Sequence, residues 1–310
     1  MGKSRRRFGA WLAAMVGTIA LFGAVLAPGA IGQEGSPSGE TPSEETPSEE
    51  SPSDASSSPR VPEQAVVASG DVSAQAPLPI GGPVTIMGID AEDGGVDAHG
   101  PIGVYAGIIN SLSALAKNNG AGILVLGGGK VLTDNVTEFW DEIATLTGIP
   151  VTYSNGAAVG TQSFAGFRIV AVVSGDGETA DGGLNAVECQ ALAARQQDFF
   201  DFVNAGGGLL VFAQDVSGGL GCEYAFFGGF GAISFTTGLS YDDIDVTPAG
   251  TAAGLSDLLD VFAWHDTYQT FPSFLSVLAT VAASSTPPGE VAALGGASVV
   301  IPGAEVLFAG

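Results

Sequence analysis

The chain has 310 residues and a formal net charge of −24 at pH 7, with 33 acidic residues against nine Lys and Arg residues. This charge repels phosphate backbones and anionic headgroups and so argues against nucleic-acid binding. Hydrophobic residues make up 45% of the chain, which is long enough to bury a sizeable core.

Residues 1–32 have the pattern of an export signal. Four basic residues precede the apolar run Phe8–Val25, and Ala30 and Gly32 are small residues at the positions that a signal peptidase reads. The string Ser4–Phe8 also resembles a twin-arginine signal. We expect an exported protein, extracellular or associated with the cell envelope. An uncleaved membrane anchor is the alternative, and it would be the chain's only membrane contact.

Residues 33–79 form a low-complexity segment. The sequence TPSEE at Thr41–Glu45 is repeated at Thr46–Glu50, in a stretch rich in proline, serine and glutamate. Such a composition cannot bury enough apolar surface to offset chain entropy. We expect a disordered linker that leads into a folded domain at residues 80–310.

Apolar runs and helical patterns alternate along this domain. Asp134 is placed to cap a helix, Pro101 opens another, and a third is expected over Leu184–Ala205. The runs that predict strands are Pro83–Gly88, Ile123–Leu126, Pro150–Tyr153, Phe167–Val173, Leu209–Ala213, Val246–Ala249, Leu275–Thr280 and Ser298–Ile301. This alternation predicts an α/β domain whose sheet is mainly parallel, with helices on both faces.

Five segments carry a resemblance to a known superfamily. They read ILVLGGGK, FRIVAVVSG, QDFFDFVNAGGGLLVFAQD, VTPAGTAAGLSD and WHDTYQTFPSFLSVLAT. Their order and spacing over Val84–Ile301 resemble the class I glutamine amidotransferase-like superfamily. Within it the chain looks closest to the trehalose-utilisation-like and other exported branches that are not amidotransferases. The resemblance implies a three-layer, flavodoxin-like fold.

The same resemblance implies where an amidotransferase would carry its nucleophilic cysteine, and this chain has no cysteine at that position. Amidotransferases of this fold carry a cysteine directly after the strand that corresponds to Leu209–Ala213, and a later His-x-Glu pair. Here Gln214 and Asp215 follow that strand, and His265 is followed by Asp-Thr. Without a thiolate beside a base there is no activated nucleophile, so we do not expect glutaminase activity.

Polar residues follow several predicted strands. Because parallel strands end at the same edge of a sheet, Asp90, Lys130, Asp176, Gln214 and Asp215 are expected to line one ligand cleft. The resemblance implies that His265 comes near it. Asp215 and His265 are therefore the candidate catalytic residues, although acids in such loops often only solvate the loop or cap a helix.

Two kinds of metal site are open at this point. Asp90, Asp93 and Asp97 offer hard oxygen ligands on a glycine-bearing loop, which suits calcium. Alternatively, His99 and His265 could combine with these carboxylates to hold zinc or iron. The sequence favours the calcium site, because two histidines 166 residues apart are weak evidence for a shared metal.

The chain has two cysteines, Cys189 and Cys222. In an exported protein the expected state is a disulfide between them, and a buried free thiol is the alternative.

Two functions from different classes follow. The first is an exported amidotransferase-like domain without the cysteine nucleophile, a non-catalytic binding or surface-displayed module. Its ligand would be a small molecule, a carbohydrate or an envelope component. The second is a hydrolase or sugar-modifying enzyme that uses an acidic cleft, with or without a bound metal.

Overall fold

The computed structural model describes residues 79–175, 181–214, 230, 233–260, 262 and 264–302. The predicted export signal and residues 33–78 of the predicted linker lie outside this range. Within the described residues, none of the helices has the length and hydropathy needed to cross a membrane.

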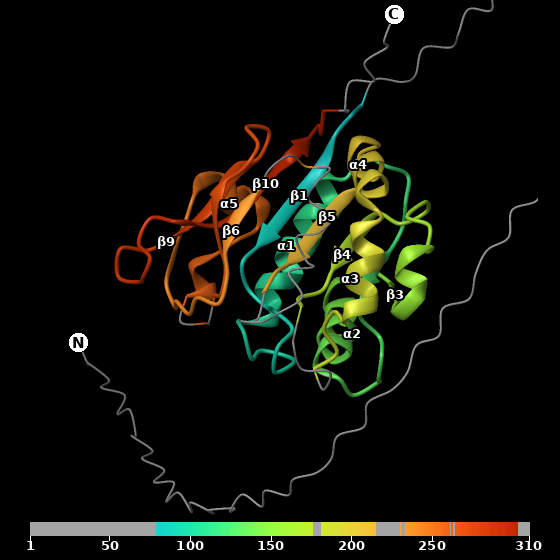
Figure 1. Ribbon diagram of the computed structural model, residues 1–310, viewed down its shortest axis with the longest axis horizontal. Coiled ribbons are helices and arrows are strands. Elements are labelled where there is room, and N and C mark those ends of the chain that lie inside the picture. Colours follow the sequence, from blue (N-terminus) through green and yellow to red (C-terminus); the bar gives the residue numbers. More distant parts are fainter. Residues whose placement is uncertain are drawn as a thin grey trace, which may run out of the picture. The chain divides into compact units, whose positions relative to one another are not determined.

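One half of the sheet is parallel and follows the predicted strands closely. Its strands run in the order β3-β2-β4-β5-β1, and each pair of neighbours is parallel. β2 and β4 are fully buried four-residue apolar strands, as continuous apolar runs in a parallel sheet should be. The bounds are β1 Gly82–Met87, β2 Ile123–Leu126, β3 Val151–Ser154, β4 Ile169–Val172 and β5 Gly208–Phe212 (Figure 1).

The first two helices begin where local signals place them. α1 spans Ile102–Leu115 and α2 spans Asn135–Thr147. Asp134 caps α2, because its Oδ1 accepts a hydrogen bond of 2.6 Å from the Thr137 amide. α2 ends at Gly148, whose φ of 69° lies in the left-handed region that glycine favours.

The predicted helix over Leu184–Ala205 was wrong as a single element. The structure divides it into α3, Ala186–Ala193, and α4, Gln196–Asn204. At the break, the buried Arg195 guanidinium donates to the Val159 carbonyl at 2.7 Å and lies 3.9 Å from the centre of the Phe164 ring. Val159 and Phe164 are far from Arg195 in the sequence, so the helical periodicity of this segment could not reveal the break.

The other half of the sheet is antiparallel, so the ten-stranded sheet is mixed. β10 pairs antiparallel with β1, and β8 and β9 both pair with β10. The prediction of a mainly parallel sheet therefore describes the first half of the domain only. The bounds are β6 Ser234–Thr236, β7 Ile244–Val246, β8 Thr267–Thr270, β9 Ser276–Val281 and β10 Val291–Val299.

Two later strand predictions were displaced. The expected strand Val246–Ala249 ends at Val246, because Thr247 caps the short helix α5, Pro248–Ala253, by accepting from the Gly250 amide at 3.1 Å. The expected strand Ser298–Ile301 is only the end of β10, which starts seven residues earlier, at Val291.

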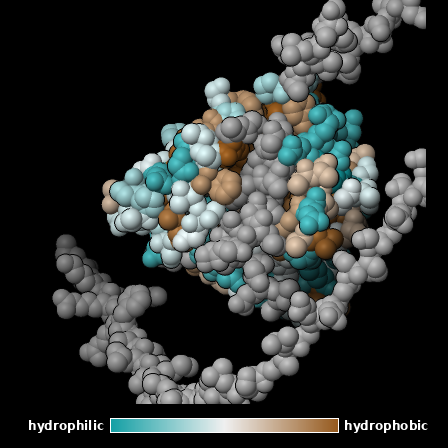
Figure 2. Space-filling model, in the orientation of Figure 1, coloured by the Kyte–Doolittle hydropathy of each residue, from teal (hydrophilic) through white to brown (hydrophobic). Residues whose placement is uncertain are grey.

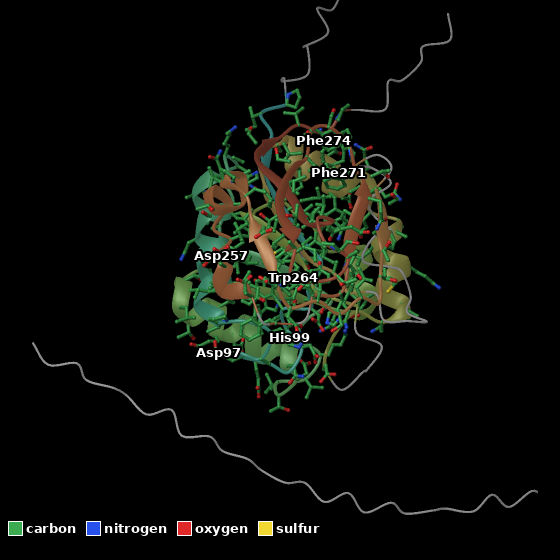
Figure 3. The ribbon with its side chains drawn as sticks, turned by 90° about the vertical axis from the view of Figure 1, so that its left-hand side faces the viewer. Asp97, His99, Asp257, Trp264, Phe271 and Phe274 are labelled. Carbon is green, nitrogen blue, oxygen red and sulfur yellow. The ribbon has the colours of Figure 1, made fainter. Side chains whose placement is uncertain are left out.

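The large buried side chains form a continuous core on the sheet. The rings of Tyr105 in α1, Phe139 in α2 and Phe212 in β5 contact one another edge to face, with ring centres 5.4 to 5.9 Å apart. Trp264 is also fully buried, and it lies near the middle of the domain in Figure 3. On the surface, hydrophilic and hydrophobic residues are interspersed over the face that Figure 2 shows.

Gly88 joins the two halves of the sheet just after β1. Its amide donates to the Ala292 carbonyl at 3.0 Å, and its carbonyl accepts from the amides of His265 at 2.8 Å and Asp266 at 3.1 Å. A Cβ at this position would fall 2.1 Å from the Asp266 carbonyl oxygen. Only glycine lets the segment before β8 approach β1 this closely.

We predict that Gly88→Ala lowers the free energy of unfolding by about 2 to 3 kcal/mol, because the methyl group forces the backbone of Asp266 away from β1. Urea unfolding measures this. Gly103→Ala is the matched control: Gly103 lies exposed in α1 with no atom within 4 Å of the added Cβ. It should stabilise the protein by about 0.5 to 1 kcal/mol. Equal effects of the two changes would contradict the close contact at Gly88.

Candidate metal centre

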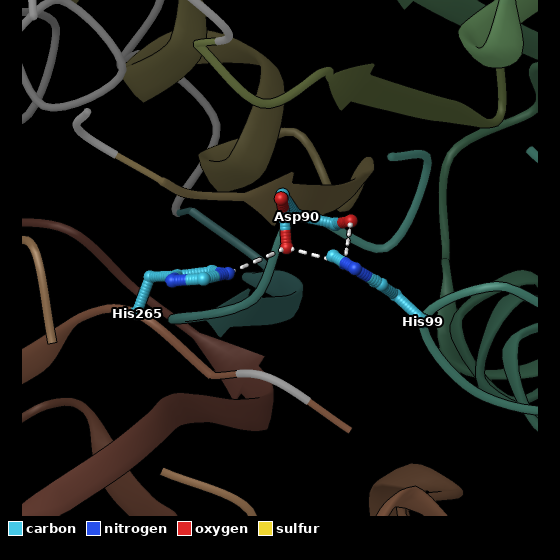
Figure 4. Close-up of side chains that lie close together, drawn as sticks. All are labelled: Asp90, His99 and His265. Atoms are coloured by element: carbon cyan, nitrogen blue, oxygen red, sulfur yellow. Dashed lines mark hydrogen bonds and ion pairs between the residues drawn. The ribbon is translucent and has the colours of Figure 1, made fainter. Parts of the chain in front are cut away.

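Three side chains from distant parts of the chain meet at the carboxyl end of β1. Asp90 follows β1, His99 belongs to the loop between β1 and α1, and His265 stands just before β8 (Figure 4). The Gly88 contact brings His265 here. The Tyr105 hydroxyl donates to the His99 carbonyl and so holds the loop against α1.

The ligand atoms of these residues lie close together. His99 Nδ1 is 2.6 Å from Asp90 Oδ1, and His265 Nε2 is 3.2 Å from the same oxygen. One ligand atom from each residue can be chosen so that all lie within 4.8 Å of one another. Zinc ligands at about 2.0 to 2.2 Å in tetrahedral geometry are roughly 3.4 Å apart. His99 Nδ1 is closer than this to Asp90 Oδ1 and also lies 3.0 Å from the Asp90 carbonyl oxygen, so the His99 ring must turn to ligate a metal.

Hydrogen bonding fixes the tautomer of His265. Its Nδ1 lies 3.0 Å from the Leu239 carbonyl, which can only accept, so Nδ1 carries a proton. In a neutral ring Nε2 is then a bare lone pair. His265 Nε2 faces Asp90 Oδ1 at 3.2 Å, and Asp90 Oδ2 is buried without a hydrogen-bond partner among the described residues. A lone pair facing a carboxylate needs either a second proton on the ring or a cation.

The charges of the three groups are coupled. Burial pushes the pKa of Asp90 upward, but interaction with the two imidazoles outweighs it and leaves this pKa below its ordinary value. The pKa of His99 is raised, chiefly by its hydrogen bond to Asp90. Burial opposes the charge of His265, yet the same carboxylate raises its pKa as well. The site therefore favours one negative carboxylate and positive charge beside it.

Glu92 is a buried residue that the sequence analysis missed. It is fully buried, and it accepts hydrogen bonds from Trp140 Nε1 at 3.3 Å and Ser174 Oγ at 3.2 Å. Burial raises the pKa of Glu92 to about 8, and the negative charge of Asp90 adds to this. The only signal in the sequence was a second acid two residues after Asp90.

The residues predicted for the ligand cleft have different positions. Lys130 forms an ion pair of 2.9 Å with the fully buried Glu188 and donates to the carbonyls of Gly182 and Gly183. The Lys130 side chain therefore links its own loop to Gly182, Gly183 and the start of α3. Gln214 follows β5 and is half-buried. The other two predicted residues, Asp176 and the catalytic candidate Asp215, lie outside the described residues.

The three predicted calcium ligands are engaged separately. Asp97 Oδ1 accepts from the Ile102 amide at 2.7 Å at the start of α1, and Asp97 has a φ of 64°. Asp93 is exposed, with Oδ2 3.6 Å from His99 Nε2. Asp90 faces the histidines. Calcium binding by these residues stays a prediction.

Cys189 is disulfide-bonded. The cysteine expected as its partner, Cys222, lies outside the described residues.

Comparison with protein-family models, with curated proteins and with solved structures found no match to this chain. The chemistry of the site therefore has to be argued from its own geometry.

We predict that Glu92 makes stability depend on pH. A carboxyl whose pKa is higher in the folded than in the unfolded state binds its proton more tightly when folded. Its stabilisation is complete below the unfolded value of about 4.5 and is lost as pH rises towards about 8. Glu92→Gln keeps an uncharged hydrogen-bonding group at this position. Over the same pH interval, the free energy of unfolding of this variant should therefore fall by roughly 4 kcal/mol less than that of the wild type.

The measurement is urea unfolding between pH 4.5 and 8.5 with a chelator present, so that no metal contributes. The wild type should lose more stability than Glu92→Gln over this interval. Parallel stability curves for the two proteins would show that the Glu92 carboxyl does not hold its proton.

Proposed function

We propose that this protein binds one divalent transition-metal ion through Asp90, His99 and His265. The observation that carries the proposal is the convergence of these three donors, one atom from each lying within 4.8 Å of the others, around a carboxylate whose Oδ2 is buried and has no hydrogen-bond partner among the described residues. An ion bound by the three residues would satisfy Asp90 Oδ2. It would also offset the cost of burying the Asp90 carboxylate.

The donor set indicates which metals fit. Two imidazole nitrogens and one carboxylate oxygen suit zinc or iron(II), whereas calcium and magnesium select oxygen ligands. His265 donates its other ring nitrogen to a main-chain carbonyl, which is the usual arrangement for a metal-binding histidine. Zinc or iron(II) is therefore the expected ion.

Three protein ligands leave at least one coordination position for water or a bound molecule. The histidine side chains are partly exposed, at 19% for His99 and 16% for His265, so solvent reaches the edge of the site, while His265 Nε2 itself is buried. A metal in such a site lowers the pKa of bound water and polarises oxygen atoms of a ligand. We propose metal-dependent binding of a small molecule, carbohydrate or envelope component, and hydrolysis of that ligand as the second candidate function.

We further propose an exported protein whose fold is the three-layer, flavodoxin-like fold of the class I amidotransferase-like superfamily. In support, α1 and α4 both pack on β1 and β5, while right-handed crossovers place α1 and α4 on opposite faces of the sheet. The parallel strands nevertheless run β3-β2-β4-β5-β1, unlike the flavodoxin order 2-1-3-4-5. Glutaminase activity is not part of the proposal, because the turn directly after β5 has Gln214 and Asp215 where amidotransferases carry the cysteine.

We predict that the purified protein, first treated with a chelator, binds one equivalent of Zn²⁺ in a calorimetric titration. Asp90→Asn and His265→Asn should each weaken binding by at least about a hundredfold, because each removes a ligand. Elemental analysis of the untreated protein should find zinc or iron close to one per chain.

Asp97→Asn is the matched control. The new side chain keeps an oxygen that can accept from the Ile102 amide, and asparagine tolerates the φ of 64°. Its zinc affinity should equal that of the wild type. The proposal fails if zinc does not bind, or if Asp97→Asn weakens binding as much as Asp90→Asn. Tight calcium binding lost in Asp97→Asn would favour the calcium site instead.

A further inference from the structure

A second feature, independent of the metal centre, is a pocket of about 200 Å³ between α1, α5 and the sheet, hereafter the cavity, which opens to solvent beside the exposed residues Ala252, Ser276 and Ala297. It lies beside the amino half of β1, whereas Asp90 follows the carboxyl end of that strand. Most of its lining is apolar, and none of the described residues that form it is charged. Its apolar walls include Pro83, Leu112, Leu115, Ala253, Leu278 and Ala297.

The walls of the cavity are held at fixed distances by two glycines of the α5 segment. A Cβ on Gly250 would fall 2.0 Å from the Leu278 carbonyl oxygen of β9, and one on Gly254 would fall 3.0 Å from Ile108 Cα of α1. The backbone of α5 is thus already in contact with both neighbours, so it cannot move inward to close the space. The side chains that α5 presents to the cavity are alanines, which are too short to fill it.

One polar group in the lining has no partner. Thr85 of β1 is 1% exposed, and its hydroxyl forms no hydrogen bond with any described residue. A buried hydroxyl without a partner is unfavourable. The other side-chain hydroxyl in the lining belongs to Ser276, which is exposed.

We propose that this cavity binds a small neutral molecule with an apolar body and one oxygen that hydrogen-bonds to Thr85, in the class of medium-chain alcohols and ketones. An apolar cavity of about 150 Å³ binds benzene, so this one admits roughly eight non-hydrogen atoms. Carboxylates are disfavoured, because the lining has no cation and the chain carries a net charge of −24. The proposal does not depend on a metal at Asp90.

The test is a titration of the purified protein with 1-heptanol, followed by NMR of the Leu112, Leu115 and Leu278 methyl groups. Saturable shifts at these methyls are expected, with heptanoate binding at least tenfold more weakly. Thr85→Val keeps the shape of the side chain and removes the hydroxyl, so it should lower heptanol affinity about fivefold. Ala253→Leu fills the cavity and should abolish binding.

Ala114→Leu is the matched control, because Ala114 is exposed on α1 and is not one of the lining residues. The affinity of this variant for 1-heptanol should equal that of the wild type. If Ala253→Leu fails to fold, Ala252→Leu takes its place. The proposal is overturned if 1-heptanol gives no saturable shifts, if the shifts lie elsewhere, if heptanoate binds equally well, or if Thr85→Val leaves the affinity unchanged.

Discussion

The arrangement of this domain depends on one backbone contact, at Gly88. There the carbonyl group accepts two amides from the segment that carries His265, and no side chain could occupy the space between them. The contact fixes the antiparallel half of the sheet against the end of β1. It places His265, from late in the chain, 3.2 Å from Asp90, which lies just beyond the end of β1. Close packing of the backbone on both sides of β1 thus brings the residues of the site together.

Charge then sets the character of the site. Asp90 is almost completely buried, and a buried carboxylate is stable only with positive charge or hydrogen bonds beside it. Two imidazoles supply these, while the neighbouring acid, Glu92, stays neutral below about pH 8. One charged and one neutral carboxyl avoid the repulsion that two charges would create. Asp90 is thus held as a carboxylate, the form in which it can ligate the metal ion that we propose.

Local signals predicted local structure well. The apolar run Ile123–Leu126 became β2, and the Asp134 cap follows from three residues of sequence. Elements that depend on distant contacts were not predictable: the helix broke at Arg195, whose guanidinium reaches Val159. The start of β10 was hidden because Gly295 and Gly296 interrupt its apolar pattern. For the site, the sequence named the two histidines with the nearby carboxylates only as the less favoured of two metal sites, because their convergence rests on tertiary packing at Gly88.

X-ray absorption spectroscopy of the zinc-loaded protein tests the central claim most directly, because it reports the atoms bound to the metal. The account predicts two imidazole nitrogens at about 2.0 to 2.1 Å, with outer-shell scattering from their rings, and oxygen at about 2.0 to 2.2 Å. In His265→Asn the spectrum should fit one imidazole. A first shell of oxygen alone, or two imidazoles retained in His265→Asn, would contradict a metal centre built from Asp90, His99 and His265.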